Sequence, residues 1–173
     1  MRWKTGPTRA LPAVILPLAL FPATATPQAS PVPHVDSVLI LKKDHLLELL
    51  ANGNVVRTYK VALGQGGLAP KRKQGDGLTP EGRYIIDARY ASSHYHKALH
   101  VSYPNAEDRK RAAQKGVSPG GEIMIHGLPN GRGAIGSVHR LYDWTLGCIA
   151  VTDEEIDEIW NQVPVRTPVE IRP

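Results

Sequence analysis

Residues 37–63 constrain the fold most. Short β-type runs occur there, and a tight-turn signal separates two of them. Residues 37–41 and 46–50 are apolar and partly β-branched, and residues 55–63 continue the β pattern. Asn52 and Gly53 separate the second run from the third, and both tolerate the positive φ angles of a two-residue hairpin turn. This segment therefore predicts an antiparallel meander.

The chain then continues with short β-type runs that glycine and proline interrupt. Residues 64–82 are dense in glycine and predict a long loop that ends in the turn Thr79-Pro80-Glu81-Gly82. The glycine spacing does not match a phosphate-binding loop, and no helical pattern follows it. Further strands are expected at residues 83–86, 99–103, 122–126 and 167–171, and a short polar surface helix at 105–115.

One helix has a complete sequence signature. Thr152 is a candidate N-cap, and Glu155 three residues later completes a capping box. Ile156 and Ile159 begin an apolar face, and Pro164 helps to end the helix. Together with the strands, this pattern predicts a mainly β (α+β) fold with one or two short helices packed on or between sheets.

The N-terminus has the three parts of a secretory signal. Arg2, Lys4 and Arg9 precede the apolar stretch 11–21, and Ala23-Thr24-Ala25 offers small residues for cleavage. We expect a signal peptide at residues 1–25, a linker at 26–34 and one folded domain at 35–173. A retained N-terminal anchor is the alternative. After signal removal, no stable membrane insertion is expected.

The net charge says little about partners. Loss of residues 1–25 removes three basic residues and no acidic one, so the formal charge falls from +5 to +2. A nucleic-acid partner is therefore not expected. The basic runs 71–73 and 109–111 are either solvated loops or sites of attraction to an anionic cell-wall polymer.

Cys148 is the only cysteine, so it cannot form an internal disulfide bond. It is either a reactive thiol or an inert buried one. Gly147 precedes it and would let a substrate approach the backbone closely. Among seven histidines, His126 is the best-placed base, because it ends an apolar strand and is followed by Gly127. Papain-like proteases have the opposite chain order, with the cysteine first.

These residues resemble the L,D-transpeptidase catalytic domain (YkuD-type) family. Its signature is similar to Ile123-Met124-Ile125-His126-Gly127 followed by Thr145-Leu146-Gly147-Cys148-Ile149. Residues 79–84 and 166–171 resemble its strand entry and its closing strand, so the resemblance covers roughly residues 37–172. It implies a YkuD-like antiparallel β-sandwich and a catalytic domain at 35–173.

The resemblance also implies a mechanism. Family members attack the third-residue carbonyl of a peptidoglycan stem tetrapeptide, D-Ala leaves, and an acyl-enzyme thioester forms. An amine of a second stem, or of a wall-anchored protein, then resolves it. By this resemblance Cys148 is the nucleophile and His126 the general acid/base, oriented by the Gly127 carbonyl. The backbone N–H groups of Gly147 and Cys148 would hold the oxyanion. No cofactor or metal is expected, and the location is the periplasm or cell wall.

Two departures from the family pattern keep the reaction open. Leu146 replaces the usual second histidine, and Ala150 stands where the family often has Arg or Asn. The segment 143–151 looks more like the YafK-like branch, which includes enzymes that cleave links to peptidoglycan. A cysteine hydrolase of peptidoglycan peptide links, a carboxypeptidase, endopeptidase or amidase, is therefore an alternative to a transferase. A non-catalytic wall-binding module is another.

Several residues near the cysteine are candidates for substrate binding. Trp144 and Tyr142 flank its loop and would line the cleft or simply pack. Arginine suits carboxylate recognition, and Asp143 would alternatively pair with one of the basic residues in the same loop. The substrate-binding candidates are Trp144, Thr145, Arg132, Arg140, His139 and Tyr142.

A zinc site is a further alternative. His94, His96 and His100 have even spacing, so a strand would place all three on one face. Residues 91–96 do not have a strand pattern, however, and a thiolate mechanism needs no metal.

Overall fold

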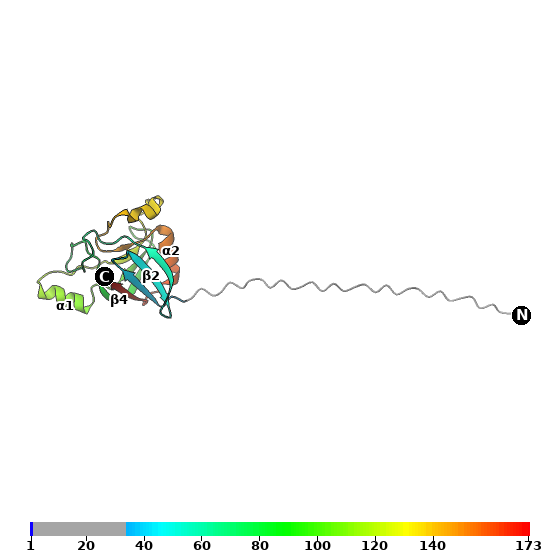
Figure 1. The fold of residues 1–173 in the computed structure, drawn as a ribbon, viewed down its shortest axis with the longest axis horizontal. Helices are drawn as coiled ribbons and strands as arrows, with labels where there is room; N and C mark the ends of the chain where they lie inside the picture. Colours follow the sequence, from blue (N-terminus) through cyan, green and yellow to red (C-terminus); the bar gives the residue numbers. More distant parts are fainter. Residues whose placement is uncertain (2–33) are drawn as a thin grey trace. The chain divides into compact units, whose positions relative to one another are not determined.

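The structure is a computed structural model in which Met1 and residues 34–173 are described (Figure 1). The predicted signal at residues 1–25 and nearly all of the linker at 26–34 lie outside the described residues, so both stay predictions. The elements in chain order are β1 (Ser37–Leu41), β2 (Leu46–Ala51), β3 (Asn54–Lys60), β4 (Gly82–Tyr90), β5 (Ala98–Val101), α1 (Ala106–Gln114), β6 (Met124–His126), the 3-10 helix η1 (Gly133–Leu141), β7 (Ile149–Ala150), α2 (Asp153–Gln162) and β8 (Pro168–Arg172).

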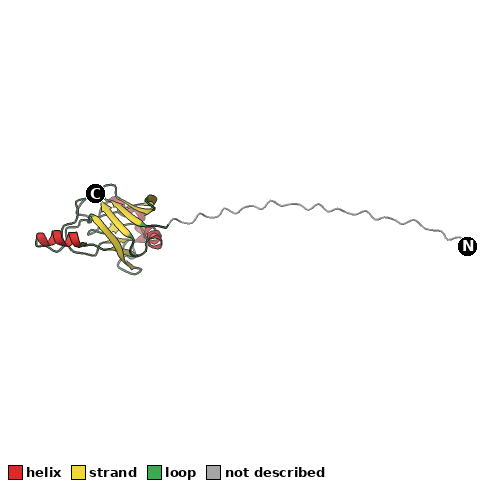
Figure 2. Ribbon diagram, turned by 90° about the horizontal axis from the view of Figure 1, so that it is seen from below, coloured by secondary structure: helices red, strands yellow, loops and turns green. Residues whose placement is uncertain are grey.

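The eight strands form one sheet in the order β3-β2-β1-β8-β4-β5-β6-β7. The predicted meander is present, since β1, β2 and β3 pair antiparallel. The mainly β fold class with few helices is confirmed, and Figure 2 shows how strands dominate it. The sheet is mixed rather than wholly antiparallel, because β1 pairs with β8 and β6 pairs with β7 in parallel.

The β2–β3 hairpin forms for the reason that its turn residues indicated. Asn52 and Gly53 have φ angles of 52° and 76°, the left-handed values that a two-residue hairpin needs. Burial alternates residue by residue along β1 and β2, so one face of each strand enters the core and the other stays partly exposed. The hairpin is therefore specified locally and held by burial.

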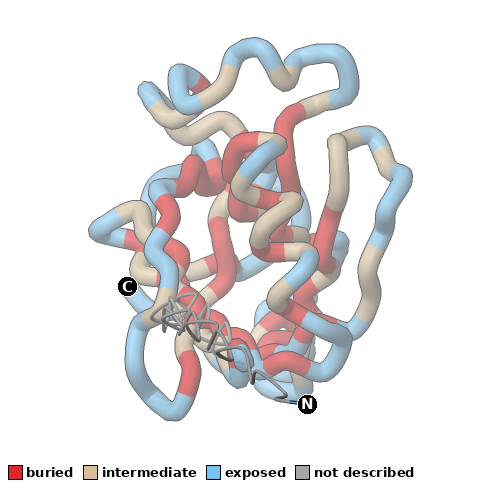
Figure 3. The backbone as a smooth tube through the Cα atoms, turned by 90° about the vertical axis from the view of Figure 1, so that its right-hand side faces the viewer, coloured by how far each residue is buried: buried red, intermediate tan, exposed pale blue. Residues whose placement is uncertain are grey.

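The hydrophobic core lies between the inner face of the sheet and α2, and Figure 3 shows the buried segments gathered inside the domain. The predicted capping box of α2 is present, with Thr152 accepting from Glu155 N and the Glu155 side chain accepting from Thr152 N. Ile156 and Ile159 of α2 are fully buried. Helix α2 also places its N-terminus directly after β7, next to the candidate site.

The polar helix expected at residues 105–115 is present as α1. Asn105 caps it, and Asp108 completes a capping box that the sequence did not identify. Asp108 is buried, because its carboxylate accepts from the Tyr84 hydroxyl at 3.0 Å and pairs with Arg111. Helix α1 is thus tied to the sheet by polar contacts more than by an apolar face.

A buried lysine anchors the glycine-rich loop 64–82. Lys42 follows β1, and its side chain is fully buried. Its Nζ donates to the carbonyls of Ala69 and Thr79 at 3.0 and 2.9 Å and to the Glu81 carboxylate at 2.9 Å. All three ammonium hydrogens therefore have acceptors, which compensates the loss of hydration.

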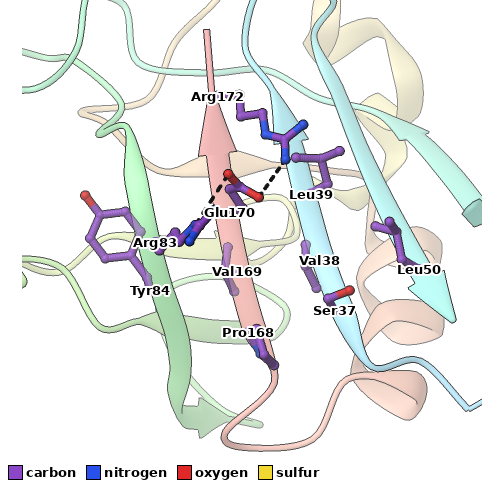
Figure 4. Close-up of a pocket in the computed structure, with 10 residues that line it drawn as sticks. All are labelled: Ser37, Val38, Leu39, Leu50, Arg83, Tyr84, Pro168, Val169, Glu170 and Arg172. Carbon is purple, nitrogen blue, oxygen red and sulfur yellow. Dashed lines mark hydrogen bonds and ion pairs between the residues drawn. The ribbon is translucent and has the colours of Figure 1, made fainter. Parts of the chain in front are cut away.

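The central strands carry exposed charges on their outer face. Glu170 of β8 lies between Arg172 at 2.8 Å and Arg83 of β4 at 3.6 Å, as Figure 4 shows. Exposed pairs of this kind contribute little to stability. Among the described residues, no helix has the length and apolar character needed to cross a membrane.

Replacing Lys42 by methionine should lower the free energy of unfolding by roughly 3 kcal/mol, because it leaves the buried Thr79 carbonyl, the Ala69 carbonyl and Glu81 without their donor. Urea denaturation measures the change. Lys43→Met is the matched control, since Lys43 is exposed and should change stability by less than about 0.5 kcal/mol. Equal losses in both variants would contradict the anchoring role of Lys42.

Candidate active site

The pairing of β6 with β7 brings His126 and Cys148 together. In the parallel register Ile125 lies opposite Ile149 and His126 opposite Ala150. Cys148 precedes Ala150 by two residues, so its side chain points to the same face of the sheet as His126. The structure therefore places the predicted base, which ends β6, and the predicted nucleophile, which directly precedes β7, on one face of two paired strands.

The His126 imidazole is oriented by the backbone that follows it. Its Nδ1 lies 2.7 Å from the Gly127 carbonyl oxygen, which can only accept, so Nδ1 carries the hydrogen. Nε2 is left with a free lone pair, is buried, and has no hydrogen-bond partner in residues 34–173. Burial lowers the His126 pKa to about 4, against a smaller opposing effect of the Gly127 carbonyl. His126 is thus a neutral base at neutral pH.

Cys148 is a protonated thiol in the same conditions. Its Sγ donates to the Glu122 carbonyl at 3.4 Å. Burial raises the pKa of the thiol, while the Met124 N–H and the Lys71 ammonium act in the opposite direction. Neither Cys148 nor His126 hydrogen-bonds the other. The two groups are therefore a neutral pair that shares a face without a direct bond.

An open cleft of about 560 Å³ gives access to the thiol. The glycine-rich loop forms one wall, and the bend before β6 forms another. His126 does not line this cleft, because an aromatic side chain covers it. The lining residues are Lys71, Gln74, Gly75, His94, Tyr95, Gly120, Gly121, Glu122, Ile123, Met124, Thr145, Leu146 and Cys148.

Tyr95 provides that cover. Its ring stacks on the His126 imidazole with a centroid distance of 3.8 Å and an interplanar angle of 29°. Trp144 meets the same imidazole edge-on at 5.8 Å. Tyr95 was not among the predicted site residues, because it lies in the loop between β4 and β5 and no local motif marks it.

The domain as a whole matches a known protein family. The family model for the L,D-transpeptidase catalytic domain (YkuD) matches residues 35–171. The chain belongs to the L,D-transpeptidase catalytic domain family.

Curated relatives and solved structures support the assignment. The chain is 32% identical over 132 residues to "Putative L,D-transpeptidase YafK" of Escherichia coli K12, covering 73% of this chain and 46% of that protein. The helical cell shape determining protein Pgp2 of Campylobacter jejuni has a TM-score of 0.62 and 27% identity over 80% of this chain and 47% of that one. Bd1075 of Bdellovibrio bacteriovorus, at 24% identity and a TM-score of 0.58 over 82% of this chain and 48% of that one, shares the fold. The chain therefore spans about half the length of these proteins.

In this L,D-transpeptidase domain, Thr145 shapes the cysteine loop. Thr145 is almost fully buried, and its hydroxyl accepts from Gly147 N at 3.1 Å and donates to the Cys148 carbonyl at 2.8 Å. Thr145 also lines the cysteine cleft, so its expected substrate-binding role stays a prediction beside this internal one. The Gly147 N–H is also occupied, so it is not free to donate to an oxyanion as expected.

Glycine is required at position 147 by both conformation and space. Its φ is 128°, and a Cβ there would lie 2.6 Å from the Leu78 carbonyl oxygen. Loop 64–82 packs directly under the cysteine loop, since Gly64 bridges to Thr145. Close backbone contact with loop 64–82 explains why position 147 is a glycine. The approach of a substrate, expected from the sequence, is not needed to explain it.

The charged candidates divide into two groups. Arg140 pairs with Glu155 at the start of α2, so its guanidinium is engaged within the fold. Asp143 does not pair with the basic residues of its own loop, as considered above. It accepts instead from Leu63 N at 2.7 Å and contacts His45 at 3.0 Å. The remaining candidates, Arg132, His139, Tyr142 and Trp144, line a second cavity that does not include Cys148.

The three evenly spaced histidines do not converge. His96 contacts Asp157 at 2.8 Å and His100 contacts Asp87 at 2.5 Å, while His94 lines the cysteine cleft. The structure describes no cluster of three metal-ligating side chains within residues 34–173. The zinc arrangement considered above is therefore not formed by these residues.

The low pKa of His126 links stability to pH. The unfolded chain, with an ordinary histidine pKa of 6.5, binds the proton before the folded chain does. Stability from this group is complete above pH 6.5 and is lost as pH falls to about 4, by roughly 3 kcal/mol. His126→Gln should lack this loss. Denaturation curves of wild type and His126→Gln across this pH range measure the difference. Carboxylate titration changes the stability of both proteins equally, so it cancels in the comparison. Parallel pH profiles would contradict the burial effect.

Gly147→Ala should destabilise the domain by about 3 kcal/mol, because the new methyl group meets a backbone carbonyl and the left-handed φ is strained. Gly116→Ala is the control: its φ is 64°, and a Cβ there meets nothing within 4 Å. It should cost about 1 kcal/mol. Chemical denaturation compares the two, and similar costs would show that Leu78 moves aside.

Proposed function

We propose that this domain is a cysteine acyltransferase of the L,D-transpeptidase type that acts on peptidoglycan stem peptides. The observation that carries the proposal is the oriented, neutral His126 on the same sheet face as Cys148. Nδ1 donates to the Gly127 carbonyl, which leaves Nε2 as the basic atom. This is the backbone-carbonyl version of a nucleophile, a base and an orienting third group.

The proposed first half-reaction forms a thioester. His126 Nε2 removes the thiol proton as Sγ attacks the stem-peptide carbonyl, and the tetrahedral oxyanion forms in the cleft. The same imidazolium then gives its proton to the leaving amine, and the C–N bond breaks. In the second half, an amine or a water attacks the thioester, with His126 again as base. Acceptors of the first kind are a second stem peptide or a wall-anchored protein.

Oxyanion stabilisation falls to the Cys148 N–H in this proposal. The Gly147 N–H already donates to the Thr145 hydroxyl. The Cys148 N–H donates to no described residue, and its loop is held rigid through Thr145 and Gly64. A fixed donor next to the attacked carbonyl needs no reorganisation when charge develops there.

Proton transfer is coupled to substrate binding in this scheme. Burial keeps His126 unprotonated and Cys148 protonated, and the thiol is bonded to Glu122 instead of His126. The thiol must therefore turn from the Glu122 carbonyl toward Nε2 when a carbonyl enters the cleft. Lys71, buried beside the cleft and paired with Asp76 at 2.7 Å, favours the thiolate that forms.

The location that fits this substrate is outside the cytoplasm. The export signal predicted at residues 1–25 supports it, as does the family of the domain. The name of the Campylobacter jejuni neighbour links that protein to helical cell shape. We therefore propose that this domain acts in the periplasm or cell wall, where its peptide chemistry would modify the wall.

The full chain, incubated with disaccharide tetrapeptide, should release D-Ala, and Cys148→Ala should reduce release at least about 1000-fold, since the nucleophile is lost. Mass spectrometry distinguishes a cross-linked dimer, as for a transpeptidase, from a tripeptide, as for a carboxypeptidase. His126→Gln should be nearly as inactive. Leu141→Ala, an exposed change outside the cleft, is the control. Equal activity of Cys148→Ala and wild type would refute the cysteine mechanism.

A further inference from the structure

The basic runs 71–73 and 109–111 are far apart in the sequence but meet at one cavity in the fold. This α1 pocket has a volume of about 240 Å³ and lies between the glycine-rich loop and α1, the helix at the edge of the domain in Figure 1. The first run contributes Lys71 and Arg72 to its walls, and the second contributes Arg111. The remaining lining residues are Tyr103, Asp108, Gln114 and Lys115.

Positive charge exceeds negative charge in this pocket. Four cationic side chains and one carboxylate line it. The carboxylate, Asp108, is buried and already pairs with Arg111, and Glu107 of the same helix lies 3.6 Å from that guanidinium. Arg72 and Lys115 are exposed, and neither side chain has an ion pair or hydrogen bond with another described residue. The pocket therefore keeps two positive charges that the described fold does not use.

Lys71 adds a buried cation whose hydrogen-bond donors are only partly used. Its side chain is 4% exposed, and among the described residues its Nζ has one acceptor, the Asp76 carboxylate at 2.7 Å. Lys42, which is buried to a similar extent, has three acceptors. An ammonium group carries three hydrogens, so two of those on Lys71 lack an acceptor in this part of the chain. Buried donors of this kind call for a further acceptor.

The combination of donors favours a phosphate group as that acceptor. Arg72 and Lys71 line the pocket from the loop, and Lys115 lines it from the end of α1. A carboxylate has only two oxygens to share among three cations, whereas a phosphate group has more oxygens and can accept from several cations at once. The volume corresponds to about eight water molecules at ~30 Å³ each, so a phosphate group fits.

The surroundings of the α1 pocket favour a polymer over a membrane surface. Exposed basic side chains continue outside the pocket at Lys73, Arg109 and Lys110, so repeating negative charges would meet several cations. No large apolar side chain is exposed within 69–76 or 103–118, the two segments that form the pocket. Helices that bind a membrane surface combine basic residues with apolar side chains that enter the lipid. A soluble polyanion therefore suits this surface better than a lipid headgroup does.

We propose that the α1 pocket binds a phosphate group of an anionic cell-wall polymer. Arg72 and Lys115 hold the phosphate, the buried Lys71 donates to it, and neighbouring phosphates of the polymer meet the exposed basic residues. Lys71 also lines the cysteine cleft, so the bound polymer lies beside that cleft. The cell wall as the source of the polymer rests on the proposed function. Recognition of phosphate does not, because it follows from the lining of the pocket.

Titration calorimetry of the full chain with inorganic polyphosphate tests the pocket, and wild type should bind the probe in a saturable way. The double variant Arg72→Gln/Lys115→Gln should weaken binding at least about tenfold, because two charge-assisted contacts are lost. The control Lys43→Gln/Arg83→Gln makes the same charge change at exposed positions, with Arg83 on the outer face of the sheet (Figure 4). It should weaken binding by less than about twofold.

Other outcomes overturn the assignment. Equal weakening in both double variants would reduce the binding to net charge, and poly-L-glutamate that binds as tightly as polyphosphate would reject phosphate recognition. Tighter binding per phosphate to phosphatidylglycerol vesicles, or to a single-stranded oligonucleotide, would reject the wall polymer. A chain that binds polyphosphate through Arg72 and Lys115 but leaves tetrapeptide intact would keep the site and reject the proposed reaction. The reverse result would reject the site alone.

Discussion

The parallel pairing of β6 with β7 is the contact on which the rest of the site depends. The two strands are short, yet their register decides that His126 and Cys148 face the same side. A slip of one residue would turn Cys148 to the opposite face. The register is held within the pair, where Val151 N donates to the His126 carbonyl at 3.0 Å, and from outside it, where Ala62 and Ala150 exchange two backbone hydrogen bonds. Backbone hydrogen bonds thus connect β6, β7 and the segment around Ala62 at this edge of the sheet.

Burial, more than charge pairing, sets the chemistry at this edge. The imidazole stays unprotonated because it is excluded from water under Tyr95, and the thiol stays protonated because it too is buried. The ion pairs lie one layer further out, in the glycine-rich loop, where Lys42 and the Lys71–Asp76 pair hold the backbone in place. That loop supports the cysteine loop through close backbone contact. The contacts that stabilise the loop therefore also hold the cysteine in position.

The aromatic side chains divide the surroundings of His126 into two compartments. Tyr95 stands between the imidazole and the thiol cleft, whereas Trp144 stands between the imidazole and the second cavity.

Local chemistry in the sequence determined the hairpin at Asn52-Gly53 and the capped helix α2, because turn and cap geometry depend on a few adjacent residues. The sequence also singled out Cys148 and His126, through their glycine neighbours and a family resemblance. Only the tertiary structure decided the partners of Lys42, Asp143 and Arg140, and the stacking of Tyr95 on the base. These contacts join residues far apart in the chain, and such partners are chosen by how strands and loops pack in space, which no local pattern encodes.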